Sequence, residues 1–256
     1  MSAQTIGRLT VVGIGPGPDG WLTPAVSVAL AEADDLFGYG PYVDRAPKRP
    51  GQVRHASDNG DELVRANAAL SAARSGRKVV VVSGGDPGVF AMASAVCEAI
   101  ERGPASWRDL DVCVEPGVTA MLAAAARVGA PLGADFACLS LSDNLKPWSL
   151  IEKRLRLTSE AGLALALYNP ASLARPDRIG KAFALLRELR GAETPVVFAT
   201  SVGRRDERID VVRLGSADPA RADMRTLIIV GCEATRIIER PGLPPLVYSE
   251  RFAKEA

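Results

Sequence analysis

Histidine and aromatic residues are scarce in this sequence, and their scarcity excludes several kinds of active site. The 256 residues include a single histidine, His55, and aromatic residues make up 5% of the chain. One histidine excludes an HExxH motif and any metal centre built on two histidines. His55 lies in the polar segment QVRHASDNGDE, where we expect an exposed loop without a chemical role.

Paired cysteines, excess charge and long apolar runs are absent as well. Cys97, Cys113, Cys138 and Cys232 form no CxxC pair and lie in apolar stretches, so we expect small core residues and no metal site. A formal net charge of +1 does not favour a nucleic-acid or membrane partner. No apolar run is long enough to span a bilayer, and the N-terminal MSAQTIGR lacks a signal-peptide core, so we expect a cytoplasmic protein.

Short apolar runs alternate with helical patterns in the first half of the chain, which predicts an α/β fold with a mostly parallel sheet. Residues 79–83 include four valines, as is typical of a central parallel strand. Thr23 followed by Pro24 predicts a helix start, because threonine caps helices and proline suits their first position. The other expected elements are strands at 9–14, 36–38 and 111–114 and helices at 61–75, 91–101 and 119–127.

A Gly- and Pro-rich segment, GAPLGADF at residues 129–136, interrupts this alternation, and we place a domain boundary there. The predicted domains are residues 1–130 and 131–256. Closely spaced strands late in the second half predict a mixed sheet. The elements expected after the boundary are strands at 138–141, 163–168, 196–200, 209–213 and 226–230, helices at 148–157 and 177–189, and a docked tail after Arg240.

The first glycine-rich loop, in LTVVGIGPGPDGWLTP at residues 9–24, matches no phosphate-binding motif. Its glycines do not have the GxGxxG spacing, and no GxxxxGK[ST] segment occurs in the chain. Pro16 and Pro18 lack the N–H groups that grip phosphate. Asp34 and Asp35 lie at the distance of a dinucleotide-binding acid, but they precede the expected strand. A plain structural turn is the alternative interpretation.

Two further loops follow predicted strands, in SGGDPGVFAMA at residues 83–93 and EPGVTA at residues 115–120. Ligands in open α/β sheets bind beyond the C-terminal ends of strands, so we expect the three loops to form one rim. Gly84 and Gly85 let a ligand approach the backbone closely. The Asp86 carboxylate, without a basic neighbour, suits hydroxyls or an amine better than a phosphate. Three independent structural turns are the alternative.

The motifs GIGPG…LTP, GGDPGVF and PGVTA, in this order and spacing, resemble the tetrapyrrole methylases, a class of S-adenosylmethionine-dependent methyltransferases. The resemblance continues through LYNPAS, TSVGR and TLIIVG and covers nearly the whole chain. Within the family, FGYGPYVD, SGGDPGVFAMA and SLSDNLKPW are the more selective segments. They imply an enzyme of cobalamin biosynthesis that methylates carbon 17 of precorrin-3B and contracts the ring to give precorrin-4.

Three alternatives stay open. One is a non-catalytic tetrapyrrole-binding or carrier protein, which would leave the three cofactor-type loops unexplained. Another tetrapyrrole methylase would act on a different ring carbon or on cobalt-precorrin-3, although the lack of a cysteine cluster for an iron–sulfur centre favours a metal-free substrate. A nicotinamide-dependent oxidoreductase is the less favoured alternative, because the acid is misplaced and the glycine spacing is irregular.

The resemblance also implies the architecture and the partners. We expect two α/β domains, with a mostly parallel N-terminal sheet, a mixed C-terminal sheet and the active site in the cleft between them. S-adenosyl-L-methionine would bind in this cleft and leave as S-adenosyl-L-homocysteine. We also expect a homodimer, a tetrapyrrole substrate and possible hand-over of product to neighbouring pathway enzymes.

The family's site residues carry over onto matching positions of this chain. The implied cofactor contacts are Pro16, Gly84, Gly85, Asp86, Val89, Thr119, Ala120, Tyr168, Asn169, Gly203, Thr226 and Leu227. The expected substrate-binding residues are Gly15, Gly17, Tyr42, Arg45, Ser140, Ser142, Lys146 and Arg175, with Lys48, Arg49 and Arg204 as further basic candidates for the substrate carboxylates.

Ring contraction needs a general base, and our candidate is Asp143 in SLSDNLKPW. The alternative is that Asp143 forms a turn or caps the helix that begins near residues 147–148.

Overall fold

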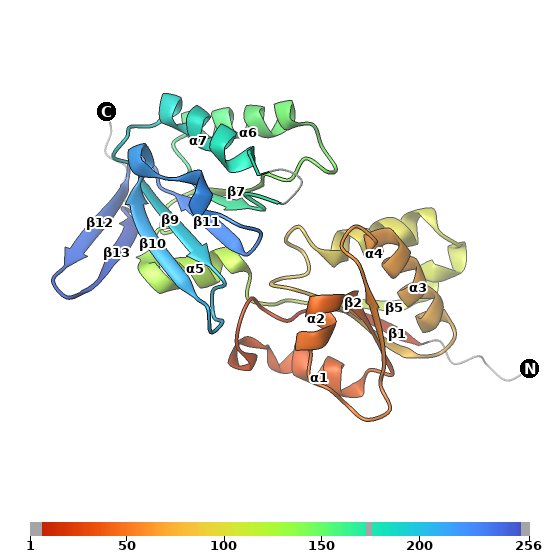
Figure 1. Cartoon of the computed structure of the whole chain (residues 1–256). Coiled ribbons are helices and arrows are strands. Elements are labelled where there is room, and N and C mark those ends of the chain that lie inside the picture. Colours follow the sequence, from red (N-terminus) through yellow and green to blue (C-terminus); the bar gives the residue numbers. More distant parts are fainter. Residues whose placement is uncertain (1–6, 173–175, 252–256) are drawn as a thin grey trace, which may run out of the picture. The chain divides into compact units, whose positions relative to one another are not determined.

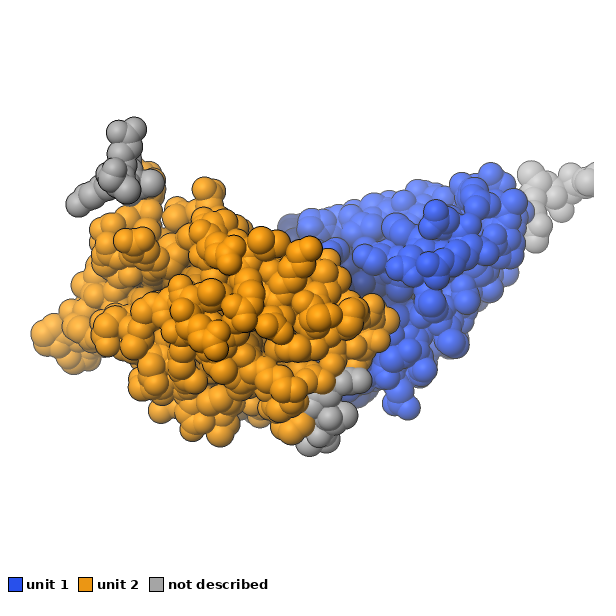
Figure 2. All heavy atoms as spheres, turned by 90° about the horizontal axis from the view of Figure 1, so that it is seen from above, with its two compact units in different colours: residues 1–120 blue, residues 121–256 orange. Residues whose placement is uncertain are grey.

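The computed structural model describes residues 7–172 and 176–251, and the chain divides into two compact units, residues 1–120 and 121–256 (Figure 2). This division falls earlier than the boundary expected at residues 130 and 131. The difference arises because Gly129 and Ala130 form a short strand that pairs with Val247 and Tyr248 near the C-terminus.

The first unit is built on a five-stranded sheet in which every strand pair is parallel, with the order β3-β2-β4-β1-β5 (Figure 1). The expected parallel sheet is therefore confirmed. Its strands are β1 (Arg8–Gly13), β2 (Asp35–Tyr39), β3 (Val53–Ser57), β4 (Lys78–Ser83) and β5 (Asp111–Glu115). Its helices are α1 (Pro24–Glu32), α2 (Gly40–Arg45), α3 (Glu62–Arg74) and α4 (Met92–Arg102).

The valine run of β4 is the centre of this sheet. Val79 and Val81 pack into the apolar cluster that α3 and α4 complete, whereas Val80 and Val82 pack into the cluster of α1 and α2. Successive side chains of a strand point to opposite faces, so both faces of the sheet are covered. The expected helix start is confirmed too, because the Thr23 side chain accepts a hydrogen bond of 3.2 Å from the Val26 N–H and Pro24 is the first helical residue.

One α-helix and one strand of this unit were not predicted, namely α2 and the edge strand β3. The expectation that His55 lies in an exposed loop is wrong. His55 is a half-buried residue of β3 whose Nε2 lies 2.7 Å from Asp35 Oδ1, and its ring stacks on Phe37 with centroids 4.1 Å apart. We missed β3 because most of its residues are polar or small, so the segment lacks the alternation of apolar and polar residues that predicts a strand. Asp35 itself is the first residue of β2.

The cysteines follow the core expectation only in part. Cys232 is buried, Cys113 and Cys138 are half-buried, and Cys97 is exposed on α4. Burial raises the pKa of the Cys138 thiol to about 11. Cys97 lies on the solvent-facing side of α4. The short apolar segment around it does not reveal which side of the helix faces the solvent.

The second unit contains a mixed five-stranded sheet with the order β10-β9-β11-β8-β7, as expected. Figure 1 shows α6 (Trp148–Glu160) and α7 (Arg178–Leu189) on one side of this sheet and α5 (Ala120–Val128) on the other. The strands are β7 (Phe136–Ser140), β8 (Ala164–Tyr168), β9 (Pro195–Thr200), β10 (Arg208–Arg213) and β11 (Thr226–Val230).

Residues 235–249 form a hairpin, where we expected only a docked tail after Arg240. β12 (Thr235–Arg240) and β13 (Leu243–Ser249) pair antiparallel, and β13 also pairs with β6 (Gly129–Ala130). The hairpin was missed because its second strand contains Pro244 and Pro245, and proline within a run usually argues against a strand. In the part of the chain that the structure describes, no helix is long and apolar enough to cross a membrane.

Asp35 is buried in the first unit and is paired with both His55 and Arg77. Burial raises the pKa of Asp35, but hydrogen bonds from Arg77 and His55 outweigh it and hold the pKa below its ordinary value. The carboxylate therefore stabilises the fold above the unfolded-state pKa of about 3.9, and this contribution is lost as the pH falls through the lower folded-state pKa.

We expect Asp35→Asn to lower the free energy of unfolding by about 1–3 kcal/mol at pH 7, with the difference from the wild type shrinking below about pH 4. Chemical denaturation at several pH values measures both effects. Asp111→Asn is the matched control, because its exposed ion pair with Arg8 contributes about 0–1 kcal/mol. Equal losses in the two variants, or an Asp35→Asn loss that does not change with pH, would contradict this account.

Candidate functional site

The three glycine loops follow neighbouring strands of the first unit, since β4, β1 and β5 are adjacent in the sheet. Gly15 in the first loop and Gly85 in the second form an isolated antiparallel bridge. Each N–H donates to the carbonyl of the other at 3.1 Å. The expectation that the loops share one rim is therefore confirmed.

Glycine is required where the loops cross one another. A Cβ added to Gly13 would lie 2.5 Å from the Gly85 carbonyl oxygen and 2.8 Å from the Gly117 nitrogen. A Cβ added to Gly117 would lie 2.4 Å from the same Gly85 oxygen. These glycines let the backbones of the three loops pack directly on one another. A comparison with the GxGxxG motif, which concerns phosphate binding, does not reveal this function.

Asp86 joins the second loop to the third. Its Oδ1 accepts a hydrogen bond of 2.8 Å from the Gly88 N–H, and its Oδ2 accepts one of 3.0 Å from the Gly117 N–H. Each carboxylate oxygen has a second lone pair, so Asp86 can still accept from a bound amine or hydroxyl. The structure gives Asp86 a structural function between the loops, and its cofactor contact stays a prediction.

Arg45 holds the first loop from α2. Its Nη2 lies 3.0 Å from the Gly15 carbonyl oxygen, 3.2 Å from that of Gly17 and 3.3 Å from that of Ile14. One guanidinium nitrogen thus faces three carbonyls of the loop. Arg45 was expected to bind substrate carboxylates; the structure gives this side chain a backbone-positioning function, and the substrate contact stays a prediction.

Most of the remaining predicted residues of this unit lie on or against the same loops, whereas Lys48 is exposed and the Arg49 guanidinium donates to the Ala33 carbonyl at the end of α1. The Tyr42 ring packs against Gly84, where a Cβ would lie 2.6 Å from Cζ of the ring. Thr119 is buried at the start of α5. The other predicted residues of the unit are half-buried, namely Pro16, Gly17, Val89 and Ala120. These predicted residues thus offer peptide groups, the Asp86 carboxylate and apolar side chains.

In the second unit, Tyr168 and Asn169 lie at the end of β8. The Tyr168 hydroxyl accepts a hydrogen bond of 3.0 Å from the Met121 N–H in the first turn of α5. Asn169 has a φ of 52°, and its Nδ2 donates to Ser140 Oγ at 2.9 Å. The structure therefore brings three predicted residues, Tyr168, Asn169 and Ser140, to the ends of the adjacent strands β7 and β8.

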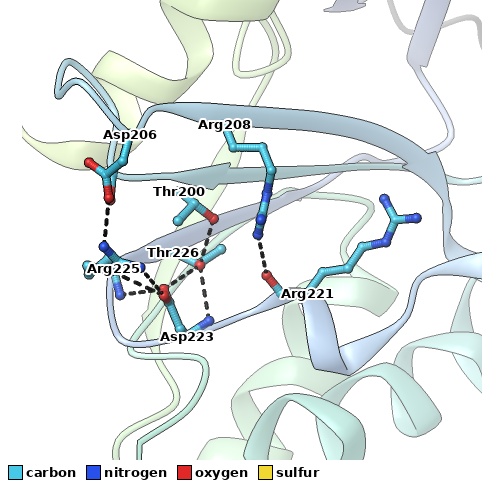
Figure 3. A network of polar contacts seen from close by, with 8 residues as sticks. Thr200, Asp206, Arg208, Arg221, Asp223, Arg225 and Thr226 are labelled. Atoms are coloured by element: carbon cyan, nitrogen blue, oxygen red, sulfur yellow. Dashed lines mark hydrogen bonds and ion pairs between the residues drawn. The ribbon is translucent and has the colours of Figure 1, made fainter.

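Thr226 belongs to a polar network at the start of β11 (Figure 3). Its hydroxyl lies 2.9 Å from Thr200 Oγ1 and donates to Asp223 Oδ1 at 2.9 Å. Burial raises the pKa of Asp223, but hydrogen bonds from Thr226 and Arg225 outweigh it and lower the pKa overall. Because the Thr226 hydroxyl is held inside the protein, any cofactor contact at this position would use its backbone.

Leu227 and Gly203, the two other cofactor candidates of this unit, have no exposed side chain that could bind a ligand. Leu227 is buried, and the Gly203 N–H donates to the Glu207 carboxylate. Arg175 lies outside the described residues.

Asp143 forms an ion pair with Arg178, with Oδ2 and Nη2 2.6 Å apart and both side chains largely buried. The same guanidinium lies 5.3 Å from the centroid of the Trp148 ring. The alternative that Asp143 caps α6 is wrong, because the N-cap residue is Pro147 and no side chain caps this helix. Sequence reasoning missed Arg178, since its distance from Asp143 along the chain leaves no local pattern.

Lys146 lies in the same segment and donates a hydrogen bond of 2.9 Å to the Ser142 carbonyl oxygen. Burial lowers the pKa of its ammonium group. Among the residues that the structure describes, no three His, Cys, Asp or Glu side chains gather where they could hold a metal ion.

Comparison with known proteins identifies the family. The model of the tetrapyrrole (corrin/porphyrin) methylases matches residues 8–218, so the chain belongs to this family and the expected family and fold are confirmed. Membership of this family argues against the alternative that the chain is a nicotinamide-dependent oxidoreductase.

Individual relatives agree. The chain is 58% identical over 246 residues to precorrin-3B C(17)-methyltransferase of Sinorhizobium sp, covering 96% of this chain and 97% of the relative. It is 49% identical to the cobalamin biosynthesis protein CobIJ of Mycobacterium tuberculosis, of which it spans 46%.

Solved structures show the same fold. The crystal structure of the methyltransferase CobJ superposes with a TM-score of 0.91 at 48% identity, covering 95% of this chain and 100% of that chain. A uroporphyrin-III C-methyltransferase from Thermus thermophilus, complexed with S-adenosyl homocysteine, superposes with a TM-score of 0.66 over 88% of this chain and 92% of that one. At 24% identity this second likeness shows the fold alone.

We expect Gly13→Ala to weaken binding of S-adenosylhomocysteine at least tenfold, because the added methyl group would force the first and second loops apart. Gly20→Ala is the matched control in the same loop, since a Cβ there meets no atom within 4 Å. Isothermal titration calorimetry measures both affinities. If the two variants bind with the same affinity as the wild type, the crossing of the loops does not build the cofactor site.

Proposed function

We propose that this chain transfers a methyl group from S-adenosyl-L-methionine to carbon 17 of precorrin-3B, with contraction of the ring to precorrin-4, in cobalamin biosynthesis. The observation that carries the proposal is the 58% identity to precorrin-3B C(17)-methyltransferase, which extends over 97% of that protein. A relative described as a cobalt-factor III methyltransferase, from Priestia megaterium, is 33% identical. The higher identity to the first relative favours the metal-free substrate.

The residues of the rim fit S-adenosylmethionine, which carries an amine and ribose hydroxyls but no phosphate. The rim offers the Asp86 carboxylate and the peptide groups of the loops, and the nearby guanidinium of Arg45 faces loop carbonyls. When bound, S-adenosylmethionine supplies a methyl group on a sulfonium centre. What the protein adds is alignment and exclusion of water, so a side-chain nucleophile is not needed.

Ring contraction requires that a hydroxyl proton be removed while a ring bond migrates and a lactone opens as a carboxylate. Asp143 is the proposed general base for the proton, and Lys146, Ser140 and Ser142 are its polar neighbours. The ion pair with Arg178 orients the Asp143 carboxylate.

The proposal includes the finer expectations about assembly and location. The enzyme would work as a cytoplasmic homodimer, bind a tetrapyrrole and pass its product to a neighbouring pathway enzyme. Family membership supports the tetrapyrrole substrate.

A turnover assay tests the proposed function. Purified protein is mixed with methyl-labelled S-adenosylmethionine and precorrin-3B, uroporphyrinogen III or a cobalt-containing analogue of precorrin-3B. We expect the label on carbon 17 of a contracted ring, from precorrin-3B only, as read by mass spectrometry and NMR. Transfer to uroporphyrinogen III alone, or no transfer to any of the three, would overturn the proposal.

We expect Asp143→Asn to slow ring contraction by about 10²–10⁴-fold while S-adenosylhomocysteine binds with unchanged affinity, because an amide cannot take the proton. Asp210→Asn is the matched control, since this acid of β10 pairs with Arg208 and Arg221 rather than with Arg178. Single-turnover kinetics with precorrin-3B separates methylation from contraction. Unchanged contraction in Asp143→Asn would exclude this carboxylate as the base.

A further inference from the structure

Phe90 in the second loop has a backbone conformation that phenylalanine rarely adopts. Its φ is 53°, in the left-handed region, and its exposed fraction is 53%. The other positive-φ residues of the described chain, apart from glycines, are Asn169 and Ser201, whose side chains are small and polar. A bulky residue in this region is an outlier, and such strain gathers at functional sites.

The strain is held in place by hydrogen bonds on both sides of Phe90. The Val89 N–H donates to the Asp86 carbonyl at 3.3 Å, and the Ala93 N–H donates to the Pro87 carbonyl at 2.9 Å. The first turn of α4 is fixed as well, because the Met92 N–H donates to Ser83 Oγ at 3.2 Å. The loop therefore sets the φ of residue 90 whichever side chain stands there, and glycine would suit this conformation best.

Phe90 lies next to the proposed cofactor contacts of the second loop. It follows SGGDPGV, the segment that carries four proposed cofactor contacts, beyond the C-terminal end of the central strand β4. A tetrapyrrole presents a broad apolar face with carboxylates only at its rim. Recognition of that face needs apolar surface, and the chain places a large, half-exposed ring here.

We infer that Phe90 is a substrate-binding residue that packs against the apolar face of the tetrapyrrole beside the methyl donor, an inference that rests on the proposed function. The sequence-based list of site residues did not include it. In the sequence, Phe90 directly precedes the helix predicted at residues 91–101, and only its φ and exposure set it apart.

The experiment compares Phe90→Gly and Phe90→Tyr with Val28→Ala, a control at an apolar residue of α1 that is 57% exposed. Binding of precorrin-3B is titrated by its absorbance in the presence of S-adenosylhomocysteine, so that no turnover is needed. Calorimetry gives the affinity for S-adenosylhomocysteine alone, and thermal unfolding gives the stability.

We expect Phe90→Gly to weaken precorrin-3B binding about tenfold or more, because it removes a large apolar contact. Its affinity for S-adenosylhomocysteine and its melting temperature should match the wild type, since glycine adopts this φ without strain. Phe90→Tyr should keep most of the pigment affinity, and Val28→Ala should keep all of it.

A Phe90→Gly variant that binds precorrin-3B like the wild type would overturn the inference. An equal loss of cofactor affinity, or a melting temperature far below that of the wild type, would also overturn it and assign Phe90 a structural role. Wild-type protein that binds the pigment but does not methylate it would overturn the proposed function alone, and the contrast at Phe90 would stand. Wild-type protein that does not bind precorrin-3B would overturn both.

Discussion

The backbone bridge between Gly15 and Gly85 is the contact on which the site of the first unit depends. It makes two loops from adjacent parallel strands into one surface, and it forms only because Gly13 and Gly117 leave room for the crossing backbones. Asp86 extends the arrangement to the third loop through the Gly117 N–H. The loops are therefore held by the protein itself, and a surface with the Asp86 carboxylate and loop peptide groups suits a cofactor without phosphate.

Arginine positions backbone in several parts of this protein. Arg45 faces three carbonyls of the first loop, Arg54 donates to the Val43 and Ala46 carbonyls at the end of α2, and Arg190 donates to the Leu163 and Gly231 carbonyls. A guanidinium suits this work because it carries five donors in a fixed plane. The sequence alone therefore does not distinguish an arginine that binds substrate carboxylates from one that binds backbone carbonyls.

Those parts of the fold with strong local patterns could be predicted from the sequence. The valine run of β4, the Thr23 cap and the Pro24 helix start each act over a few residues, and the structure contains all three. The adjacency of the loops also followed, because it comes from the geometry of a parallel sheet. What could not be predicted depends on distant partners: His55 is placed by Asp35, and Asp143 is held by Arg178. Phe90 was missed because strain in φ leaves no trace in residue type.

Amide hydrogen exchange at Gly15, Gly85 and Gly117 tests most directly whether the protein builds the cofactor site in advance. The N–H groups of all three donate to protein oxygens within the loops. We therefore expect slow exchange in the free protein and further slowing when S-adenosylhomocysteine binds. Unprotected exchange of these amides in the free protein, or protection by S-adenosylhomocysteine only in other segments, would contradict the account.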